Sequence, residues 1–156
     1  MNLIDCFIPD AASAEKLSQE PEVRRVSIVD AAALRSSASV RSIAAESGAP
    51  FTLICTKATE LKLVPFALER MLQVAADTEA DLVYADHFNV TAAGTVQAPV
   101  IDCQKGSLRD DFDFGSVLLY RTSSLKAAVS GMDADYQWAA SVHSPSHDNS
   151  MLSTYI

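Results

Sequence analysis

Residues 51–72 read FTLICTKATELKLVPFALERML, an apolar run followed by a pattern of helical period. The run from Phe51 to Cys55 is short and mostly apolar, and it predicts a buried strand. Apolar residues then recur every three or four positions, which predicts an amphipathic helix over residues 64–78 with Pro65 in its first turn. Between the two lies the polar segment Thr56-Lys57-Ala58-Thr59, which we call the 56–59 turn. A strand followed by a helix predicts one unit of a parallel sheet.

The same alternation continues through the rest of the chain. Gly48 follows one predicted helix as its C-terminal cap. Residues 88–100 alternate around Ala93-Gly94-Thr95 and predict a hairpin. The predicted fold class is therefore α/β, with one mostly parallel sheet flanked by helices. The further strands are predicted at residues 3–8, 23–30, 81–85 and 116–120, and the further helices at residues 11–20, 36–47 and 122–129.

The composition indicates one soluble globular domain. Of 156 residues, 49% are hydrophobic and 21% are charged, which suits a single domain with a real core. The formal net charge of −8 argues against a nucleic-acid backbone or an anionic membrane as the main partner, because no basic stripe offsets it. No apolar run approaches the ~20 residues that span a bilayer, and the start lacks a signal peptide. The three separated cysteines, Cys6, Cys55 and Cys103, suit reduced thiols, so we expect a cytoplasmic location.

Polar side chains occur where the predicted strands end. Asp30 closes the second strand, the 56–59 turn follows the third, and Asp86 and His87 follow the fourth. In parallel sheets, ligands bind in the crevice at the carboxyl ends of the strands. These residues are therefore the first candidates for a binding site.

Three segments give the chain a resemblance to a known family. They are VYADH at residues 83–87, RDDFDFGSVLLYRTSSLK at residues 109–126 and DADYQWA at residues 133–139. With the order of the predicted elements, they resemble a bacterial family 2 glycosyltransferase domain of the GT-A type. The resemblance implies a Rossmann-like GT-A domain over residues 1–140 that is incomplete at its C-terminus. Residues 141–156 are Ser-rich without a clear period, and we expect a divergent, disordered tail there.

The resemblance also implies an activity. Proteins of this family bind a nucleotide-diphospho-sugar and transfer the sugar to a hydroxyl of an acceptor such as a cell-envelope polysaccharide; inversion at the anomeric carbon is expected here. In the family, acidic residues at the end of the second strand help to hold the nucleoside, a role that falls to Asp30 in this chain. The alternative for Asp30 is a helix N-cap or a solvated strand end.

The 56–59 turn takes the place of the family's Asp-x-Asp motif, which binds a divalent ion, Mn²⁺ or Mg²⁺, and the sugar diphosphate. Thr56-Lys57-Ala58 has no carboxylate, and hydroxyl groups alone hold a hard cation poorly. We therefore assign no metal ligand, and a divalent ion, Mn²⁺ or Mg²⁺, remains the alternative cofactor. Lys57, beside Thr56, is expected to neutralise the diphosphate directly. The alternative is that Lys57 is a solvated turn residue.

The remaining candidates follow from the same resemblance. Asp86 and His87 fall where the family binds the sugar, and the alternative is a strand-end cap. Asp111 and Asp113 form a D-x-D sequence in a predicted loop that we expect on the acceptor side, with metal binding as the less favoured alternative. Asp135 matches the family's catalytic base, which removes the proton of the acceptor hydroxyl. Its alternative is an acid that interacts with a helix dipole.

Two functions are therefore open from the sequence. The first is a glycosyltransferase that uses a nucleotide-diphospho-sugar, favoured by Asp30, Asp86 and Asp135. The second is a non-catalytic, truncated GT-A-like remnant that acts as a binding or interaction module, favoured by the missing Asp-x-Asp and the early end of the resemblance. A hydrolase is not favoured, because neither Ser116 nor Cys103 has an adjacent base.

Overall fold

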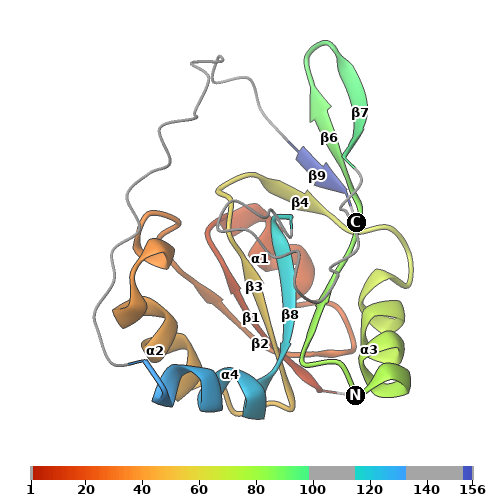
Figure 1. The fold of residues 1–156 in the computed structure, drawn as a ribbon. Helices are drawn as coiled ribbons and strands as arrows, with labels where there is room; N and C mark the ends of the chain where they lie inside the picture. The colour runs from red at the N-terminus through yellow and green to blue at the C-terminus, as the bar shows by residue number, and fades with distance from the viewer. Residues whose placement is uncertain (1, 99–114, 133–152, 156) are drawn as a thin grey trace, which may run out of the picture.

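The structure, a computed structural model, describes residues 2–98, 115–132 and 153–155 (Figure 1). Within these residues, short strands alternate with helices, and the α/β class predicted from the sequence is confirmed. In chain order the elements are β1 (Ile4–Ile8), α1 (Ala11–Leu17), β2 (Val23–Ile28), the 3₁₀ helix η1 (Ala33–Arg35), α2 (Ser37–Glu46), β3 (Phe51–Cys55), β4 (Glu60–Lys62), α3 (Ala67–Thr78), β5 (Leu82–Tyr84), β6 (His87–Thr91), β7 (Gly94–Ala98), β8 (Val117–Arg121), α4 (Thr122–Ser130) and β9 (Ser153–Tyr155).

Five strands form the main sheet, in the order β2-β1-β3-β8-β5. β1 runs parallel to β2 and to β3, whereas β8 runs antiparallel to both of its neighbours, β3 and β5. β5 therefore points in the same direction as β1, β2 and β3. The mostly parallel sheet expected from the sequence is confirmed, but the sequence does not predict that β8 is reversed.

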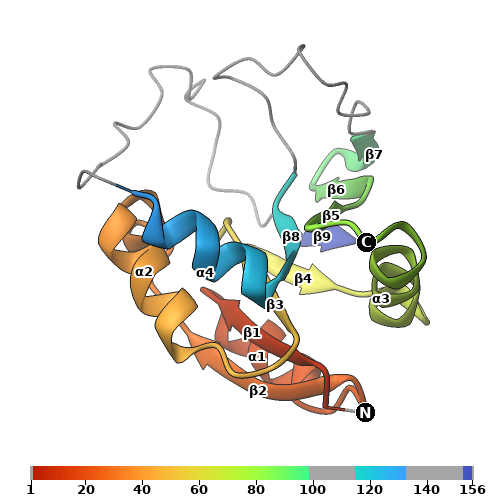
Figure 2. The same ribbon diagram turned by 60° about the horizontal axis from the view of Figure 1, so that its bottom comes forward.

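Helices cover both faces of the main sheet (Figures 1 and 2). On one face, Leu17 of α1 and Met71 of α3 pack in a core with buried strand residues. On the other face, Ile43 of α2 and Leu125 of α4 pack with Phe7 of β1. We call these the α1/α3 face and the α2/α4 face. The apolar stripe of the helix after the 56–59 turn thus packs on the sheet, as predicted.

A smaller sheet has the strand order β4-β9-β6-β7. β6 and β7 form the predicted hairpin, in which Thr91 pairs with Gly94. Gly94 has a φ of 129°, which glycine adopts without the strain that a Cβ would cause. β9 lies between β4 and β6, inside the segment 141–156 where the sequence indicates no regular element. The rest of that segment lies outside the described residues, and a three-residue strand carries too short a pattern to be predicted.

α3 begins at Ala67, later than the apolar period indicates. Phe66 takes the N-cap position with a left-handed backbone, φ 66° and ψ 13°. Pro65 therefore precedes the helix instead of lying in its first turn. The period starts before the helix because Leu63, outside it, also packs against the α1/α3 core. The spacing of the apolar residues around Leu63 therefore reflects burial against the core as well as helical structure.

Gly48 is not the C-terminal cap of α2, so that prediction is wrong. Ser47 is the C-cap residue, and its hydroxyl donates to a carbonyl of the last turn at 2.7 Å. Gly48 instead donates its backbone N–H to the carboxylate of Asp5, at 2.7 Å. A Cβ at Gly48 would lie 2.9 Å from Nη2 of Arg24. The glycine therefore leaves room for the close approach of the Arg24 guanidinium and does not cap the helix.

Asp5 is a fully buried carboxylate on β1 that holds three chain segments together. Nε of Arg24 donates to its Oδ1 at 2.8 Å, and Nη2 donates to Oδ2. The backbone N–H groups of Gly48 and Ala49 also donate to Oδ2, at 2.7 and 2.9 Å. Burial disfavours the charged form of Asp5, but the hydrogen bonds from these three residues outweigh it, so its pKa is held below the usual 3.8. The carboxylate thereby joins β1, β2 and the connection from α2 to β3.

Candidate ligand site at the strand ends

The strand register places five chain segments at one edge of the main sheet. Phe7 lies opposite both Ser27 and Ile54. Leu118 in turn lies opposite both Ile54 and Tyr84. This row crosses all five strands. Shortly beyond it the chain leaves the sheet from β1, β2, β3 and β5, and enters the sheet at β8. The polar residues two or three positions past the row are Asp10, Asp30, Thr56, Lys57, Ser116, Asp86 and His87.

The predicted site residues share this edge but are spread along it. Asp30 follows β2 at one side of the sheet, and Asp86 follows β5 at the other. Adjacent strands lie ~4.8 Å apart, so the four spacings between these two positions amount to about 19 Å. A single small group therefore cannot contact both, whereas an extended ligand along the edge can.

The 56–59 turn is joined to the start of β8. The backbone N–H of Thr56 donates to the carbonyl of Ser116 at 2.9 Å, and the Thr56 hydroxyl donates to the same oxygen at 3.4 Å. The thiol of Cys55 donates to the carbonyl of Lys57 at 3.7 Å. The side chain of Lys57 is exposed and forms no ion pair within the part of the chain that the structure describes. Its ammonium group is thus available to a ligand.

Ser116 is the residue at this edge that sequence reasoning set aside. Its side chain is 2% exposed, and its Oγ has no hydrogen-bond partner within the described residues. Cys55 and Val117 pack in the α1/α3 core, so strand alternation places Thr56 and Ser116 on the α2/α4 face. A buried hydroxyl without a partner is uncommon in folded proteins. The sequence could not identify Ser116, because the burial of its hydroxyl depends on the pairing of β8 with β3.

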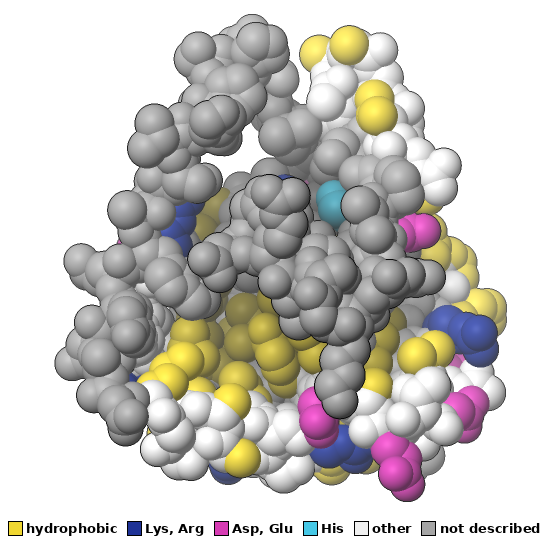
Figure 3. Space-filling model, in the orientation of Figure 1, with side chains coloured by type: hydrophobic (Ala, Val, Ile, Leu, Met, Phe, Trp, Pro, Cys, Tyr) yellow, Lys and Arg dark blue, Asp and Glu magenta, His cyan; other side chains and the backbone are white. Residues whose placement is uncertain are grey.

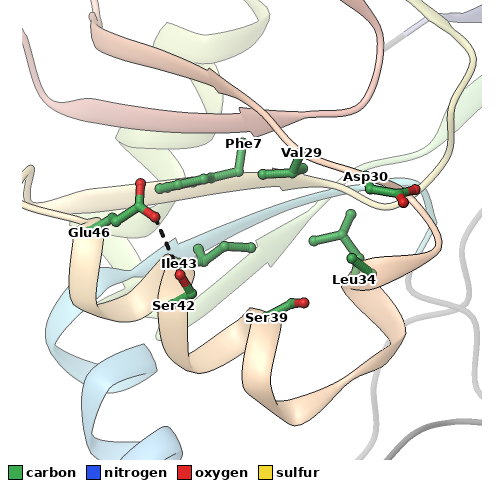
Figure 4. Close-up of a pocket in the computed structure, with 9 residues that line it drawn as sticks. Phe7, Val29, Asp30, Leu34, Ser39, Ser42, Ile43 and Glu46 are labelled. Atoms are coloured by element: carbon green, nitrogen blue, oxygen red, sulfur yellow. Dashed lines mark hydrogen bonds between the residues drawn. The ribbon is translucent and has the colours of Figure 1, made fainter.

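A pocket with a volume of about 170 Å³ lies on the α2/α4 face, between the ends of β1 and β2 and the helix α2. Figure 4 shows Asp30 and Glu46 at its two ends, with Phe7, Leu34 and Ile43 between them. Hydrophobic side chains gather on this face above α4 (Figure 3). The pocket is therefore mainly apolar, with polar groups at its rim.

Asp30 lines this pocket and also stabilises the turn that follows β2. Its Oδ1 accepts the backbone N–H of Ala32 at 2.9 Å, and its carbonyl accepts the N–H of Leu34 at 3.2 Å. Its Oδ2 has no hydrogen bond within the described residues. The structural interpretation of Asp30 therefore holds, because one carboxylate oxygen stabilises the turn after the strand, and its role toward a ligand stays a prediction.

Asp86 and His87 differ in exposure. Asp86 is exposed between β5 and β6, whereas His87 is 6% exposed and begins β6, where it pairs with Ala98. Of the two, only Asp86 presents its side chain to solvent. The other three candidates, Asp111, Asp113 and Asp135, lie outside the described residues.

The residues of the 56–59 turn do not fit a divalent cation. The turn offers the hydroxyls of Thr56 and Thr59 and the ammonium of Lys57. A positive charge repels a metal ion, and hard cations require several oxygen ligands. Across residues 2–98, 115–132 and 153–155, no group of three His, Cys, Asp or Glu residues is placed to hold a metal ion. The metal role that the family resemblance implies therefore finds no ligand set at this turn.

Comparisons with known proteins give no relative. No family model matches the chain, and neither a curated protein nor a solved structure is detectably similar to it. Among the described residues, no helix has the length and apolar character needed to cross a membrane.

Proposed function

We propose that the protein binds a nucleotide-diphospho-sugar along the carboxyl edge of its main sheet and transfers the sugar to an acceptor hydroxyl with inversion. The observation that carries this proposal is the position of two features on the α2/α4 face. The pocket beside Asp30 lies at the ends of β1 and β2, and the exposed residues Thr56 and Lys57 follow the next strand, β3, beside the start of β8. An extended anionic ligand can contact both.

The pocket supports binding of the nucleoside part. Its volume of about 170 Å³ is smaller than the ~300–1,000 Å³ of pockets that enclose a whole ligand, so it suits one moiety. Phe7 and Ile43 offer an apolar surface for a base, and the free oxygen of Asp30 can accept a hydroxyl hydrogen of a ribose. We therefore assign the nucleoside to the pocket at the ends of β1 and β2.

The 56–59 turn supports binding of the diphosphate. Lys57 supplies an exposed positive charge that can pair with a phosphate group. A cation at this position stabilises the charge that develops as the diphosphate leaves. Because the turn does not fit a divalent ion, no step is assigned to one. The sugar extends toward Asp86, the exposed one of the pair Asp86 and His87. Asp111 and Asp113 keep the acceptor-side role, and Asp135 the role of base, that the family resemblance implies, and all three lie outside the described residues.

A second function is a non-catalytic, GT-A-like module that binds the nucleotide without transferring the sugar. The observation that favours it is the donor set of the 56–59 turn, which lacks the carboxylates that the family uses for its metal ion. A protein can retain a nucleoside pocket after losing its catalytic groups, so binding alone does not distinguish the two functions.

A thermal-shift panel tests the shared binding step. UDP, GDP, dTDP and their sugar conjugates are added to the full chain with EDTA or with Mn²⁺, and the midpoint of unfolding should rise for at least one nucleotide. The variant Asp30→Asn should reduce the rise, and Glu15→Gln, an exposed carboxylate on α1, should not. The absence of a shift with every nucleotide refutes both functions.

Turnover separates the two functions. Release of the nucleoside diphosphate from the bound sugar nucleotide is followed in the parent and in Asp135→Asn, with glycan hydroxyls supplied, besides water, as acceptors of the sugar. A transferase should lose ~10²-fold or more in rate in this variant with binding unchanged, as expected for the loss of a general base. Binding without any release of diphosphate assigns the protein to the second function.

A further inference from the structure

A groove with a volume of about 460 Å³ lies between the turn before β2 and the segment that enters α3. Figure 1 shows the connection from α1 to β2 beside α3. One wall of the groove carries Glu20 and Glu22, and the other carries Val64, Phe66 and Glu69. None of these residues belongs to the candidate site at the strand ends.

Backbone hydrogen bonds fix both walls of the groove. The carbonyl of Glu22 accepts from the N–H groups of Leu3 and Ile4, at 2.7 and 3.0 Å. On the other wall, the carbonyl of Val64 accepts the N–H of Ala67 at 3.1 Å. The groove therefore exists before any partner binds, which lowers the ordering cost of an association.

Phe66 is the most exposed of the large apolar side chains in the described residues, at 78%, and Val64, at 44%, is exposed beside it. The left-handed backbone of Phe66, φ 66°, is unusual for a bulky residue. This conformation holds the ring outside the core, although the adjoining residues Ala67 and Leu68 are buried. Exposed apolar groups next to a groove are typical of protein interaction sites.

The charges of the groove are of one sign. Glu20, Glu22 and Glu69 line it, and no Lys or Arg side chain does. The whole chain carries a net charge of −8, so a second copy of the chain is repelled, and the acidic rim also repels an anionic membrane. A positively charged partner is attracted.

The first turn of α3 adds hydrogen-bond donors to the same groove. Backbone N–H groups in the first turn of a helix have no acceptor within the helix, and Phe66 supplies no side-chain cap. The N–H of Ala67 is taken by the carbonyl of Val64, but Leu68 and Glu69 also line the groove, and their N–H groups have no acceptor within the helix. The main-chain carbonyls of an extended peptide can accept from them.

We propose that this groove is the docking surface for a basic peptide segment of a partner protein, in which an apolar side chain lies next to arginine or lysine. The apolar side chain packs on Phe66 and Val64. The cations pair with Glu20, Glu22 and Glu69 on both walls. This interaction does not depend on the proposed activity at the strand ends.

Fluorescence anisotropy tests the proposal with a defined probe. A short fluorescein-labelled peptide in which arginines flank a Leu-Trp pair is titrated with the full-length protein, and saturable binding is expected below ~1 mM. Phe66→Asn should weaken it at least ~10-fold, because an apolar anchor is lost while asparagine tolerates the left-handed backbone. Val96→Asn, which alters a side chain that is 60% exposed on β7, should leave the affinity unchanged.

Charge variants supply a second test that does not depend on Phe66. Glu20→Gln with Glu22→Gln should weaken binding and flatten its salt dependence, whereas Glu15→Gln should change neither. A control peptide with glutamates in place of arginines should not bind. Each of the following results overturns the proposal: no saturable binding, equal binding by Phe66→Asn, equal binding of the acidic peptide, or Phe66-dependent self-association or binding to phosphatidylserine vesicles.

Discussion

The carboxylate of Asp5 and the guanidinium of Arg24 form a bidentate ion pair that joins the neighbouring parallel strands β1 and β2. Asp5 is fully buried, whereas the Arg24 side chain is 41% exposed. The two partners therefore differ in their access to water. Arg24 is partly solvated, whereas the Asp5 carboxylate depends on protein hydrogen-bond donors for nearly all of its stabilisation. Loss of those donors costs more than loss of an exposed ion pair.

Replacing Asp5 should destabilise the fold strongly. In Asp5→Asn, the amide cannot accept from Arg24, Gly48 and Ala49 together, and buried donors lose their acceptor. We expect the free energy of unfolding to fall by about 3–5 kcal/mol, the range for breaking a buried pair. Urea titrations followed by circular dichroism measure it. Glu46→Gln, which breaks the exposed Arg25–Glu46 pair, should change stability by less than ~1 kcal/mol.

The same carboxylate predicts how stability depends on pH. The folded pKa of Asp5 lies below the usual 3.8, so the unfolded chain binds a proton before the folded chain does. Stability should rise with pH between the two pKa values, be complete above about 3.8, and be lost as the pH falls through the folded pKa. Urea titrations at a series of acidic pH values test this. A ¹³C NMR titration of the Asp5 carboxyl group that gives a pKa above 3.8 would contradict it.

Gly48→Ala should act through Arg24. The new Cβ would lie 2.9 Å from Nη2, whose position is fixed by Asp5, so the guanidinium must move. In a double-mutant cycle with Arg24→Met, we expect a coupling energy of about 0.5–3 kcal/mol, the range for residues in contact. Gly131→Ala is the matched control, because its Cβ would meet atoms only at 3.6 Å or beyond. Equal effects of Gly48→Ala with and without Arg24 would show that the contact is unimportant.

The thiols of the main sheet should be unreactive while the chain is folded. Burial raises the pKa of Cys6 to about 12, and burial also raises the pKa of Cys55. The thiolate is the reactive form, so iodoacetamide at mildly alkaline pH should modify both residues only after unfolding. Peptide mass spectrometry, which separates Cys103, measures this. Rapid modification of Cys6 in native buffer would be inconsistent with the packing of β1.

Lys57→Ala should weaken nucleoside diphosphate binding if the ammonium group contacts the phosphates. We expect a loss of about 1.5–3 kcal/mol, the range for a charge-assisted hydrogen bond. Binding should survive EDTA, gain little from Mn²⁺ and fall with ionic strength, because an exposed pair is screened. Calorimetry measures all three effects, with Lys126→Ala on α4 as the control. Strict dependence on Mn²⁺, or unchanged affinity in Lys57→Ala, would identify Lys57 as a turn residue.

The sequence predicts the elements of this fold better than their pairing. Burial of one face gives the residues of α3 a clear period, and Phe51–Cys55 is apolar enough to identify β3. Direction and neighbours depend on contacts between distant residues, so the reversal of β8 has no local signature. Phe66 shows the same limit at a boundary, because its left-handed backbone interrupts a pattern that the apolar residues continue.

The sequence predicts where the candidate site lies in the sheet, but not which of its side chains are buried. Strand ends can be located from sequence, so Asp30, the 56–59 turn and Asp86 could be assigned to one edge. Burial of single side chains depends on the packed neighbours, so the sequence predicts neither the enclosure of His87 nor the role of Asp5. Ser116 has no catalytic motif around it, and its unpartnered hydroxyl is a property of the β3–β8 pair.

The insertion of β8 between β3 and β5 has a consequence for how the protein is made. β5 leaves the ribosome before β8 but pairs in the main sheet with β8 alone, within the described residues. A nascent chain that stops before Val117 therefore exposes the edge of β3. Closing the long loop costs entropy before the new contacts form, so we expect this step to limit the folding rate. The distance between Thr56, after β3, and Asp86, after β5, would then be fixed only when β8 inserts between these two strands.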